Sequence, residues 1–366
     1  MSAEAALRNW LRLTLIPGVG GESRRQMLKA FGLPDAIFAA GPSALRAVVG
    51  STLTERLLVH ECEREIQAAL EWAAQPGNHI LTLADAAYPQ ALLAAADPPV
   101  LLHAKGLVEL LNRPALAVVG SRNATRQGEA TAEAFAAALS AAGLTIVSGL
   151  ALGIDAAAHR GALDGRGSTV AVIGTGADRI YPSRNEALAR VIAERGVVIS
   201  EFPLGTPAMA ANFPRRNRLI AGLARGCLVV EAAERSGSLI TARLAAEAGL
   251  EVFAIPGSIH SPLAKGCHKL IKQGAKLVEK AEDILEELRW EAVVASAPVV
   301  ASLPADPEAA RLLGDMGYDP CDVDTLSVRT GLTAERLLAM LLPLELDGHV
   351  AQLPGGRYQR IPQGAA

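Results

Sequence analysis

The chain has 366 residues, half of them hydrophobic, and this length is typical of about two or three domains. Its 35 lysines and arginines against 38 aspartates and glutamates give a net charge of −3, which excludes polyanion binding through a global positive field. The four cysteines form no C-x-x-C pair and no Cys/His cluster, so the sequence predicts neither disulfides nor a metal site, in a reducing cytoplasm.

Residues 1–75 carry apolar side chains at helical spacing and predict a small helical domain of the SAM or helix-hairpin-helix type. The turn PGVG, residues 17–20, lies between two of these helices. It resembles the turn of helix-hairpin-helix modules, whose glycines free backbone N–H groups to meet a phosphate. A plain helix–helix turn has the same letters, so a DNA contact here is one of two alternatives.

Residues 76–290 change to short apolar strands that alternate with alanine- and leucine-rich helical segments. This alternation is typical of an α/β fold with a doubly wound, Rossmann-like parallel sheet that helices cover on both faces. Glycines cut the apolar run 135–154 into a helix and a strand, and no basic segment precedes an apolar core after Met1. We therefore expect neither a membrane helix nor a signal peptide. The predicted strands are 116–119, 144–147, 169–173, 197–199, 228–230 and 252–255.

Residues 291–310 are rich in alanine, proline and serine and predict a linker. Residues 311–366 then show a helix-turn-helix pattern and a hairpin, which is typical of a winged-helix domain. Between residues 315 and 350, seven acidic residues stand against two arginines. A helix that reads DNA should be more basic, so a protein-contact role is at least as well supported and a duplex-binding regulator is disfavoured.

Ligands of open parallel sheets bind beyond the carboxyl ends of the strands, so the segments after the predicted strands are the candidates for chemistry. Glycine, serine and threonine recur in these segments, together with Arg122 and Arg235. Hydroxyls and backbone N–H groups at helix N-termini bind anionic oxygens. One such turn is ordinary in an α/β protein, whereas this many with arginines favour a phosphate site.

The segment NFPRRNR, residues 212–218, places three arginines beside Phe213, and Pro214 suits the first turn of a helix. The arginines then lie near a helix N-terminus, where the helix dipole attracts anions. This pattern predicts a phosphate clamp with one stacking surface, which Asn217 would orient. The plain alternative is a solvated helix face, and it applies above all to Arg215.

The kind of phosphate ligand follows from what the turns lack. The first strand is followed by GSRNAT in place of G-x-G-x-x-G, and the chain has no Walker A lysine, so dinucleotides and nucleoside triphosphates are disfavoured. A polymer of phosphates needs only donors and cations along a groove. Aromatic residues are 4% of the chain, so we expect recognition of the backbone with weak sequence specificity.

The chain resembles the DNA-processing protein A family, also called DprA or Smf, over about residues 88–275. The resemblance implies a non-catalytic protein without a cofactor that binds single-stranded DNA during natural transformation. It also implies that the protein protects this strand, loads a RecA-type recombinase onto it, and forms a homodimer through the α/β domain. The matching segments are AVVGSRNAT (117–125), SGLALGIDAAAH (148–159), TVAVIGTGADRIYPSRN (169–185), ISEFPLGTP (199–207), NFPRRNRLIAGLA (212–224), VVEAAERSGSLITARLAAEAG (229–249) and VFAIPG (252–257).

Two positions depart from the family pattern: His268 follows Gly266-Cys267 where the family often has asparagine, and Leu152 stands where some members have arginine. The first puts one polar contact of the DNA pocket in doubt, and the second removes a possible cation. The candidate DNA-binding residues from the strand ends and the resemblance are Gly120, Ser121, Arg122, Thr125, Ser148, Gly149, Phe213, Arg216, Asn217, Arg218, Ser236, Gly237, Ser238 and Lys265.

Two enzymatic alternatives are weaker. Asp155 and His159 share a helix face, but no nucleophile is fixed beside them, so a helix cap and local packing are preferred. Nucleoside-monophosphate phosphoribohydrolases of the lysine-decarboxylase-like group are similar in their core and carry P-G-G-x-G-T-x-x-E. Here the segment after the fifth predicted strand reads EAAERSGSLITARLAAE. Hydrolysis is therefore the second hypothesis, with Glu201 and Glu231 as the carboxylates near the cleft.

Overall fold

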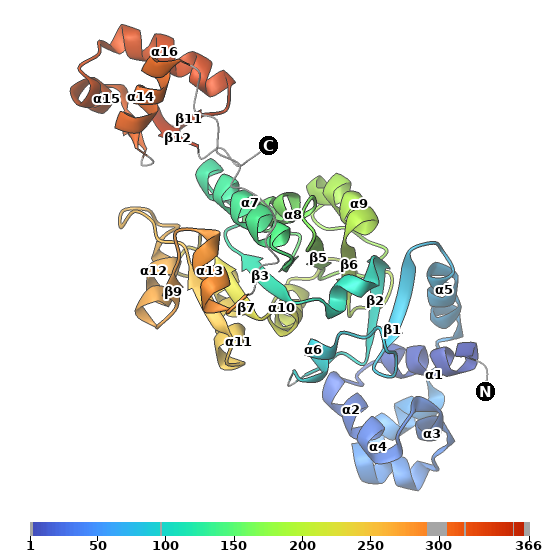
Figure 1. Ribbon diagram of the computed structural model, residues 1–366. Helices are drawn as coiled ribbons and strands as arrows, with labels where there is room; N and C mark the ends of the chain where they lie inside the picture. Colours follow the sequence, from blue (N-terminus) through green and yellow to red (C-terminus); the bar gives the residue numbers. More distant parts are fainter. Residues whose placement is uncertain (1–2, 96, 291–305, 318–319, 354, 362–366) are drawn as a thin grey trace.

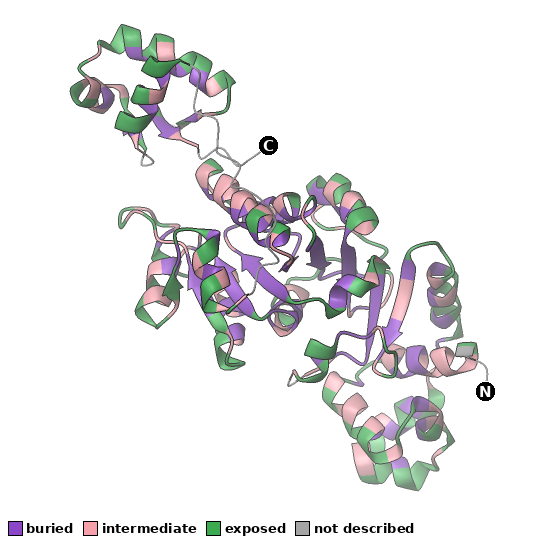
Figure 2. Ribbon diagram, viewed as in Figure 1, coloured by how far each residue is buried: buried purple, intermediate pink, exposed green. Residues whose placement is uncertain are grey.

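The computed structural model describes residues 3–95, 97–290, 306–317, 320–353 and 355–361. Figure 1 shows a group of helices at the N-terminal end, a central layer of strands flanked by helices, and a small C-terminal unit. The strands of the central layer are mostly buried, whereas many helix surfaces are exposed (Figure 2). The expected α/β class is therefore confirmed.

The centre is one sheet that has nine strands within the described residues. Seven neighbouring strands pair in parallel, in the order β6-β5-β4-β3-β7-β8-β9. All six predicted strands are present within one or two residues of their expected bounds. In spatial order the strands are β1 (Asn78–Thr82), β2 (Leu101–Gly106), β6 (Val197–Ser200), β5 (Thr169–Val172), β4 (Thr145–Ser148), β3 (Ala115–Val119), β7 (Gly226–Val229), β8 (Glu251–Ala254) and β9 (Lys276–Leu277).

One edge of the sheet was not predicted. β1 pairs with β2, and β2 pairs with β6, both antiparallel, so the sheet is mostly parallel rather than wholly parallel. β2 carries the polar residues His103 and Lys105 among its apolar ones, so its sequence lacks the continuous apolar run that predicts a central strand.

Helices cover both faces of the sheet because alternate strand residues point to opposite sides. In β3, Leu116 and Val118 pack under α7 and α8, whereas Ala117 and Val119 pack under α10 and α11. Each fully buried leucine or valine of this kind contributes about 1.5–3 kcal/mol. The helices of this region are α6 (Gln90–Leu93), η1 (Val108–Asn112), α7 (Arg126–Ala141), α8 (Ile154–Ala162), η2 (Ser183–Asn185), α9 (Glu186–Arg195), α10 (Asn212–Leu223), α11 (Ser238–Glu247), α12 (Lys265–Lys272) and α13 (Ala281–Glu287).

The first 75 residues are helical, as expected, but they pack in two groups. One apolar cluster, which includes Met27, Ile37 and Leu57, joins the first four helices. A second cluster carries Ile66 of α5 against Leu101 of β2, so α5 lies on the sheet edge. These helices are α1 (Ala3–Leu15), α2 (Gly21–Phe31), α3 (Pro34–Ala39), α4 (Pro42–Val59) and α5 (Glu63–Ala73).

The turn PGVG joins α1 to α2. Val19 is buried in the first apolar cluster, and the Arg56 guanidinium donates to the Pro17 carbonyl at 3.3 Å. The same guanidinium covers Gly18, whose φ of +77° suits glycine. A DNA contact at this turn stays a prediction.

The C-terminal unit follows the winged-helix order of helix, strand, two helices and a two-strand wing. Its small sheet has the order β10-β12-β11. The first helix begins at Pro307, with Asp306 as its cap, so the structured unit starts inside the predicted linker, before residue 311. The remaining linker prediction, residues 291–305, lies outside the described residues. The elements are α14 (Pro307–Met316), β10 (Cys321–Asp322), α15 (Val323–Thr330), α16 (Ala334–Leu346), β11 (Val350–Leu353) and β12 (Arg357–Arg360).

All four cysteines are buried and outside any disulfide: Cys62, Cys227, Cys267 and Cys321. Burial raises the pKa of the Cys227 and Cys267 thiols to about 12, so both stay protonated at neutral pH. Among the described helices, none is long and apolar enough to cross a membrane.

Candidate nucleic-acid interface

A cleft of about 630 Å³ opens at the carboxyl ends of the central strands. The chain runs from β3 outward to β6 and then returns to β7 beside β3, so the strand order reverses between β3 and β7. Open α/β sheets bind ligands at such a reversal. The walls of the cleft are the turn after β3, the start of α10 and the start of α11.

The rim of the cleft carries a cation that lies over one ring of an aromatic pair. The Arg122 guanidinium carbon lies 5.4 Å from the centre of the Phe213 ring, and Arg122 is otherwise exposed. The Tyr181 ring lies 5.6 Å from the Phe213 ring with 42° between their planes, and 48% of Tyr181 is exposed. Flat aromatic surfaces beside arginine suit a nucleobase and its phosphate. The sequence prediction did not include Tyr181.

The floor of the cleft holds a buried cation, Arg216, which is 4% exposed. Its guanidinium donates to the Val172 carbonyl at 2.6 Å, while its Nε has no protein partner among the described residues. Burial lowers the pKa of Arg216 to about 10, with the nearby Asp155 carboxylate acting in the opposite direction, so the charge persists at neutral pH. The floor therefore holds a buried cation beside the Asp155 carboxylate, with one guanidinium N–H that has no protein partner among the described residues.

Asp155 holds the loop that borders this floor. Its carboxylate accepts from the backbone N–H groups of Gly149 at 3.1 Å and Ala151 at 3.4 Å. Burial raises the pKa of Asp155, and the charges of Arg216 and Arg122 and these N–H donors counter that rise. The expected helix cap is therefore wrong: Asp155 lies inside α8, whose N-cap is Gly153, and its carboxylate holds the preceding loop and partners Arg216 electrostatically.

Gly149 leaves the space that the Arg216 guanidinium occupies. A Cβ at Gly149 would lie 1.8 Å from Arg216 Nη1. We expect Gly149→Ala to displace this guanidinium, lowering the free energy of unfolding by about 1–3 kcal/mol through overpacking. Urea unfolding measures this loss.

The matched control is Gly314→Ala in α14, where nothing lies within 4 Å of the added carbon. Because alanine is the better helix former, this control should be neutral or slightly stabilising. Equal unfolding midpoints for Gly149→Ala and the parent would contradict the prediction.

Backbone and hydroxyl groups complete the walls. The Ser121 hydroxyl accepts from Asn123 N at 3.1 Å, and the Ser121 carbonyl accepts from Ile154 N at 3.2 Å, so the turn after β3 is fixed. At the start of α11 the hydroxyls of Ser236 and Ser238 lie 2.7 Å apart. The dipole at a helix start attracts phosphate oxygens. Nine predicted residues line this one cleft: Gly120, Ser121, Arg122, Phe213, Arg216, Asn217, Ser236, Gly237 and Ser238.

Four other predicted residues do not line the cleft: two lie outside it, and two support the strands and side chains around it. Ser148 is fully buried and its hydroxyl donates to the Val118 carbonyl at 2.6 Å, which ties β4 to β3. Thr125 caps α7 and donates to Glu231 at 2.7 Å, outside the cleft. Lys265 is exposed at the start of α12 and is not among the residues that line the cleft. Gly149 acts through Arg216, as described above.

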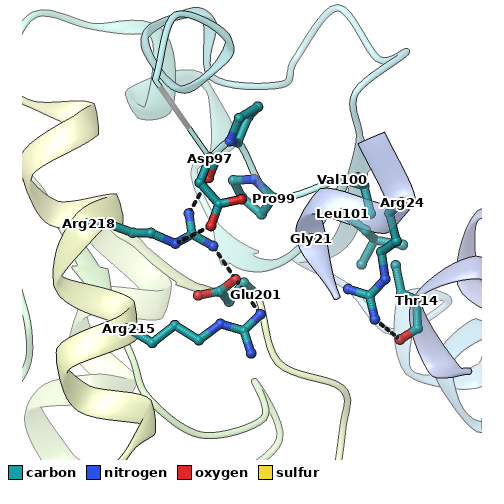
Figure 3. A pocket seen from close by; sticks show the side chains of 11 residues that line it. Thr14, Gly21, Arg24, Asp97, Pro99, Val100, Leu101, Glu201, Arg215 and Arg218 are labelled. Carbon is teal, nitrogen blue, oxygen red and sulfur yellow. Dashed lines mark hydrogen bonds and ion pairs between the residues drawn. The ribbon is translucent and has the colours of Figure 1, made fainter. Parts of the chain in front are cut away.

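The expected clamp of three neighbouring arginines does not form: Arg216 lines the cleft, whereas Arg218 pairs with Glu201 outside it. The Arg218 guanidinium donates to Glu201 at 2.5 Å and to the Asp97 carbonyl at 2.6 Å, and Arg215 contacts the same Glu201 at 3.1 Å. Figure 3 shows a small pocket beside this ion pair, in which Arg215 and Arg218 converge on Glu201 and Arg24 lies on the opposite side. The Glu201 side chain is 3% exposed, so this is a buried ion pair outside the cleft. Successive residues of α10 turn by about 100°, which separates Arg218 from Arg216.

The polar groups of the two enzymatic alternatives are also occupied. Glu201 is paired with two arginines, and Glu231 accepts from the Thr125 hydroxyl and backbone N–H. His159 is fully buried, with Nδ1 2.7 Å from the Thr169 hydroxyl, and burial lowers the pKa of its ring to about 3. His159 is therefore neutral and locally paired, as the plainer interpretation predicted.

A family model described as DNA recombination-mediator protein A matches residues 79–289, and another described as the DprA winged helix domain matches residues 296–356. The chain belongs to the DprA family. It is 41% identical over 368 residues to Protein Smf of Escherichia coli, covering 96% of this chain and 95% of that protein. It is 49% identical over 209 residues to DNA processing protein DprA of Streptococcus pneumoniae, covering 57% of this chain and 74% of that protein. The resemblance drawn from the sequence motifs is thereby confirmed.

Solved DprA structures have the same fold. The X-ray structure of DprA from Streptococcus pneumoniae matches with a TM-score of 0.68 at 39% identity, over 76% of this chain and 97% of that one. DNA processing protein A of Helicobacter pylori, whose structure was described for its single-stranded DNA binding mode, matches with a TM-score of 0.53 at 29% identity. That match covers 58% of this chain and 97% of that one.

Proposed function

We propose that this recombination-mediator protein binds single-stranded DNA in the cleft between β3, α10 and α11. The observation that carries the proposal is Arg122 stacked on Phe213 at the rim, above the buried cation Arg216. We further propose that the protein acts in the cytoplasm during natural transformation, protects the incoming strand and passes it to a RecA-type recombinase. A homodimer through the α/β domain belongs to the same proposal.

The geometry supports a single strand because the two cations differ in depth. Arg122 is exposed at the rim and Arg216 is buried at the floor, so successive phosphates of a flexible strand meet both. Phe213 and Tyr181 offer ring faces to a base, and every base has such a face. A paired duplex keeps its bases stacked on each other and gives these rings no partner. The strand binding described for the Helicobacter pylori relative agrees with this proposal.

The decisive test measures fluorescence anisotropy of labelled oligothymidine and of a labelled duplex with the full chain over a series of salt concentrations. We expect tighter binding of the single strand and a linear fall of log K with log salt. Equal or tighter binding of the duplex would reject the proposed cleft.

Recombinase loading needs its own measurement. We expect the chain to increase strand-dependent ATP hydrolysis by a RecA-type recombinase on DNA already coated with a single-strand-binding protein. No increase, with strand binding intact, would reject loading and leave strand binding standing.

Phe213→Ala should lower the affinity for oligothymidine roughly tenfold, because base–aromatic stacking contributes about 1–3 kcal/mol per base. Phe213→Leu should lose nearly as much, since it keeps apolar bulk without a ring face. The anisotropy titration above measures both, and Leu58→Ala on the exposed end of α4 serves as the remote control. Affinity that is equal in Phe213→Ala and the parent would remove the aromatic platform from the site.

Hydrolysis of nucleoside monophosphates offers a direct contrast. The two candidate carboxylates, Glu201 and Glu231, are already paired, so we expect no release of free base from purine nucleoside monophosphates. Release at enzyme-like rates would favour the hydrolase alternative.

A further inference from the structure

The winged-helix unit exposes a row of leucines on α16. Leu338, Leu342 and Leu346 are 47%, 60% and 80% exposed, and their spacing of four residues puts them on one side of the helix. The core of the unit does not use them, because Leu337, Leu341 and Leu344 on another side of α16 are buried. We name Leu338, Leu342 and Leu346 the leucine row. Contiguous exposed apolar side chains of this kind mark interaction surfaces.

The place of the leucine row in the fold is informative. In winged-helix order α16 is the second helix of the helix-turn-helix, the one that DNA-binding members lay in the major groove. Here that helix offers leucines, with Glu335 and Glu345 on the same side. Its one basic residue, Arg336, is paired with Glu308 at 2.6 Å. A surface without an unpaired cation and with two carboxylates repels a phosphate backbone.

Among the described residues, none covers the leucine row. Figure 1 shows α16 on the outer side of the winged-helix unit, away from the central sheet. The side that faces the core is the wing, where Gln359 of β12 contacts Gln127 of α7. A partner can therefore reach the leucine row without displacing the core.

We propose that the leucine row docks an amphipathic helix of another protein, one whose apolar side is bordered by lysines and arginines. Charge complementarity selects this occupant, because Glu335 and Glu345 border the row and attract cations. A second copy of α16 would bring these carboxylates against their equivalents, and like charges across an interface are unfavourable. Helix-to-helix docking through leucines at this spacing is a common recognition mode.

The test uses the full chain and a fluorescein-labelled helical peptide of leucine and lysine with leucines at helical spacing. Two comparison peptides are a scrambled sequence of the same composition and a version with glutamate in place of lysine. We expect the leucine-lysine helix to bind at least tenfold more tightly than either by fluorescence anisotropy. Leu342→Lys should weaken this binding at least tenfold, and Glu335→Gln should weaken it a few-fold with a smaller salt dependence.

The matched control is Leu58→Lys, a similarly exposed leucine of α4, which should leave peptide binding unchanged. Circular dichroism and oligothymidine affinity of each variant establish that its fold is retained, and Leu342→Ser replaces any variant that is not folded. Peptide binding that survives Leu342→Lys overturns the proposal. So does a change of self-association in Leu342→Lys by analytical ultracentrifugation, or a loss of duplex DNA binding in that variant.

Discussion

Replacing Arg122 by alanine is expected to lower the affinity for oligothymidine about 100-fold near 0.1 M salt. The variant loses a charge-assisted phosphate contact of about 1.5–3 kcal/mol and the cation that stacks on Phe213 at 5.4 Å. The slope of log K against log salt should become shallower by about 0.7, the value for one phosphate contact on a single strand. An anisotropy titration repeated at several salt concentrations measures both quantities.

Two variants separate the specific role of Arg122 from the loss of a charge. Arg122→Lys keeps the charge without the flat guanidinium, so it should restore the salt slope but only part of the affinity. Arg243→Ala removes another exposed arginine, on α11 and outside the residues that line the cleft. If Arg122→Ala and Arg243→Ala gave the same affinity and slope, Arg122 would not lie on the DNA.

Replacing Arg218 by alanine is expected to destabilise the protein by about 3 kcal/mol rather than to weaken DNA binding. The change removes the 2.5 Å partner of Glu201, a carboxylate that is 3% exposed, and leaves only Arg215 at 3.1 Å. Breaking a buried pair on one side is costly because the other charge stays buried. Urea unfolding followed by tryptophan fluorescence measures the loss, since Trp72 packs against His103 in this region. The salt slope of strand binding should not change.

The Arg218 variant should also have a pH signature. Burial raises the pKa of Glu201, and Arg218 and Arg215 lower it, so removing Arg218 raises this pKa further. A carboxyl whose folded pKa is raised contributes stability below its unfolded pKa and loses it as pH rises through the folded pKa. The deficit of Arg218→Ala relative to the parent should therefore be smallest near pH 4–5 and largest at neutral pH.

The double variant Arg218→Ala with Glu201→Gln removes the buried charge and should recover part of the lost stability. A deficit that is constant across acidic and neutral pH, or that the second substitution does not reduce, would contradict the ion-pair explanation.

The arginine segment shows what sequence reasoning reached and where it stopped. Pro214 correctly indicated a helix, and the 3.6-residue period already separates Arg216 from Arg215 and Arg218, which are three residues apart on one side. Which side faces the strand ends is decided by packing: Leu219 and Ile220 are buried in the core, and this fixes the rotation of α10. Adjacent letters were therefore a poor guide to adjacent side chains.

The central strands were predictable because both faces of the sheet are covered and the strands are continuous apolar runs. β1 and β2 carry polar residues such as His79 and Lys105, so they lack that signal. The pairing of Tyr181 with Phe213 joins a loop to the first turn of α10, and only the tertiary fold brings the two together. The start of α14 did have a local signal, Asp306 followed by Pro307, inside a segment whose proline content pointed to a linker.

The buried cysteines make the protein convenient to label. Every native thiol is enclosed, and two of them stay protonated well above neutral pH. A cysteine introduced at Asn123, which is exposed beside Arg122, would be the thiol that a maleimide dye reaches first. A fluorophore attached there can report in real time when an oligonucleotide enters or leaves the cleft. The four native cysteines need not be replaced first.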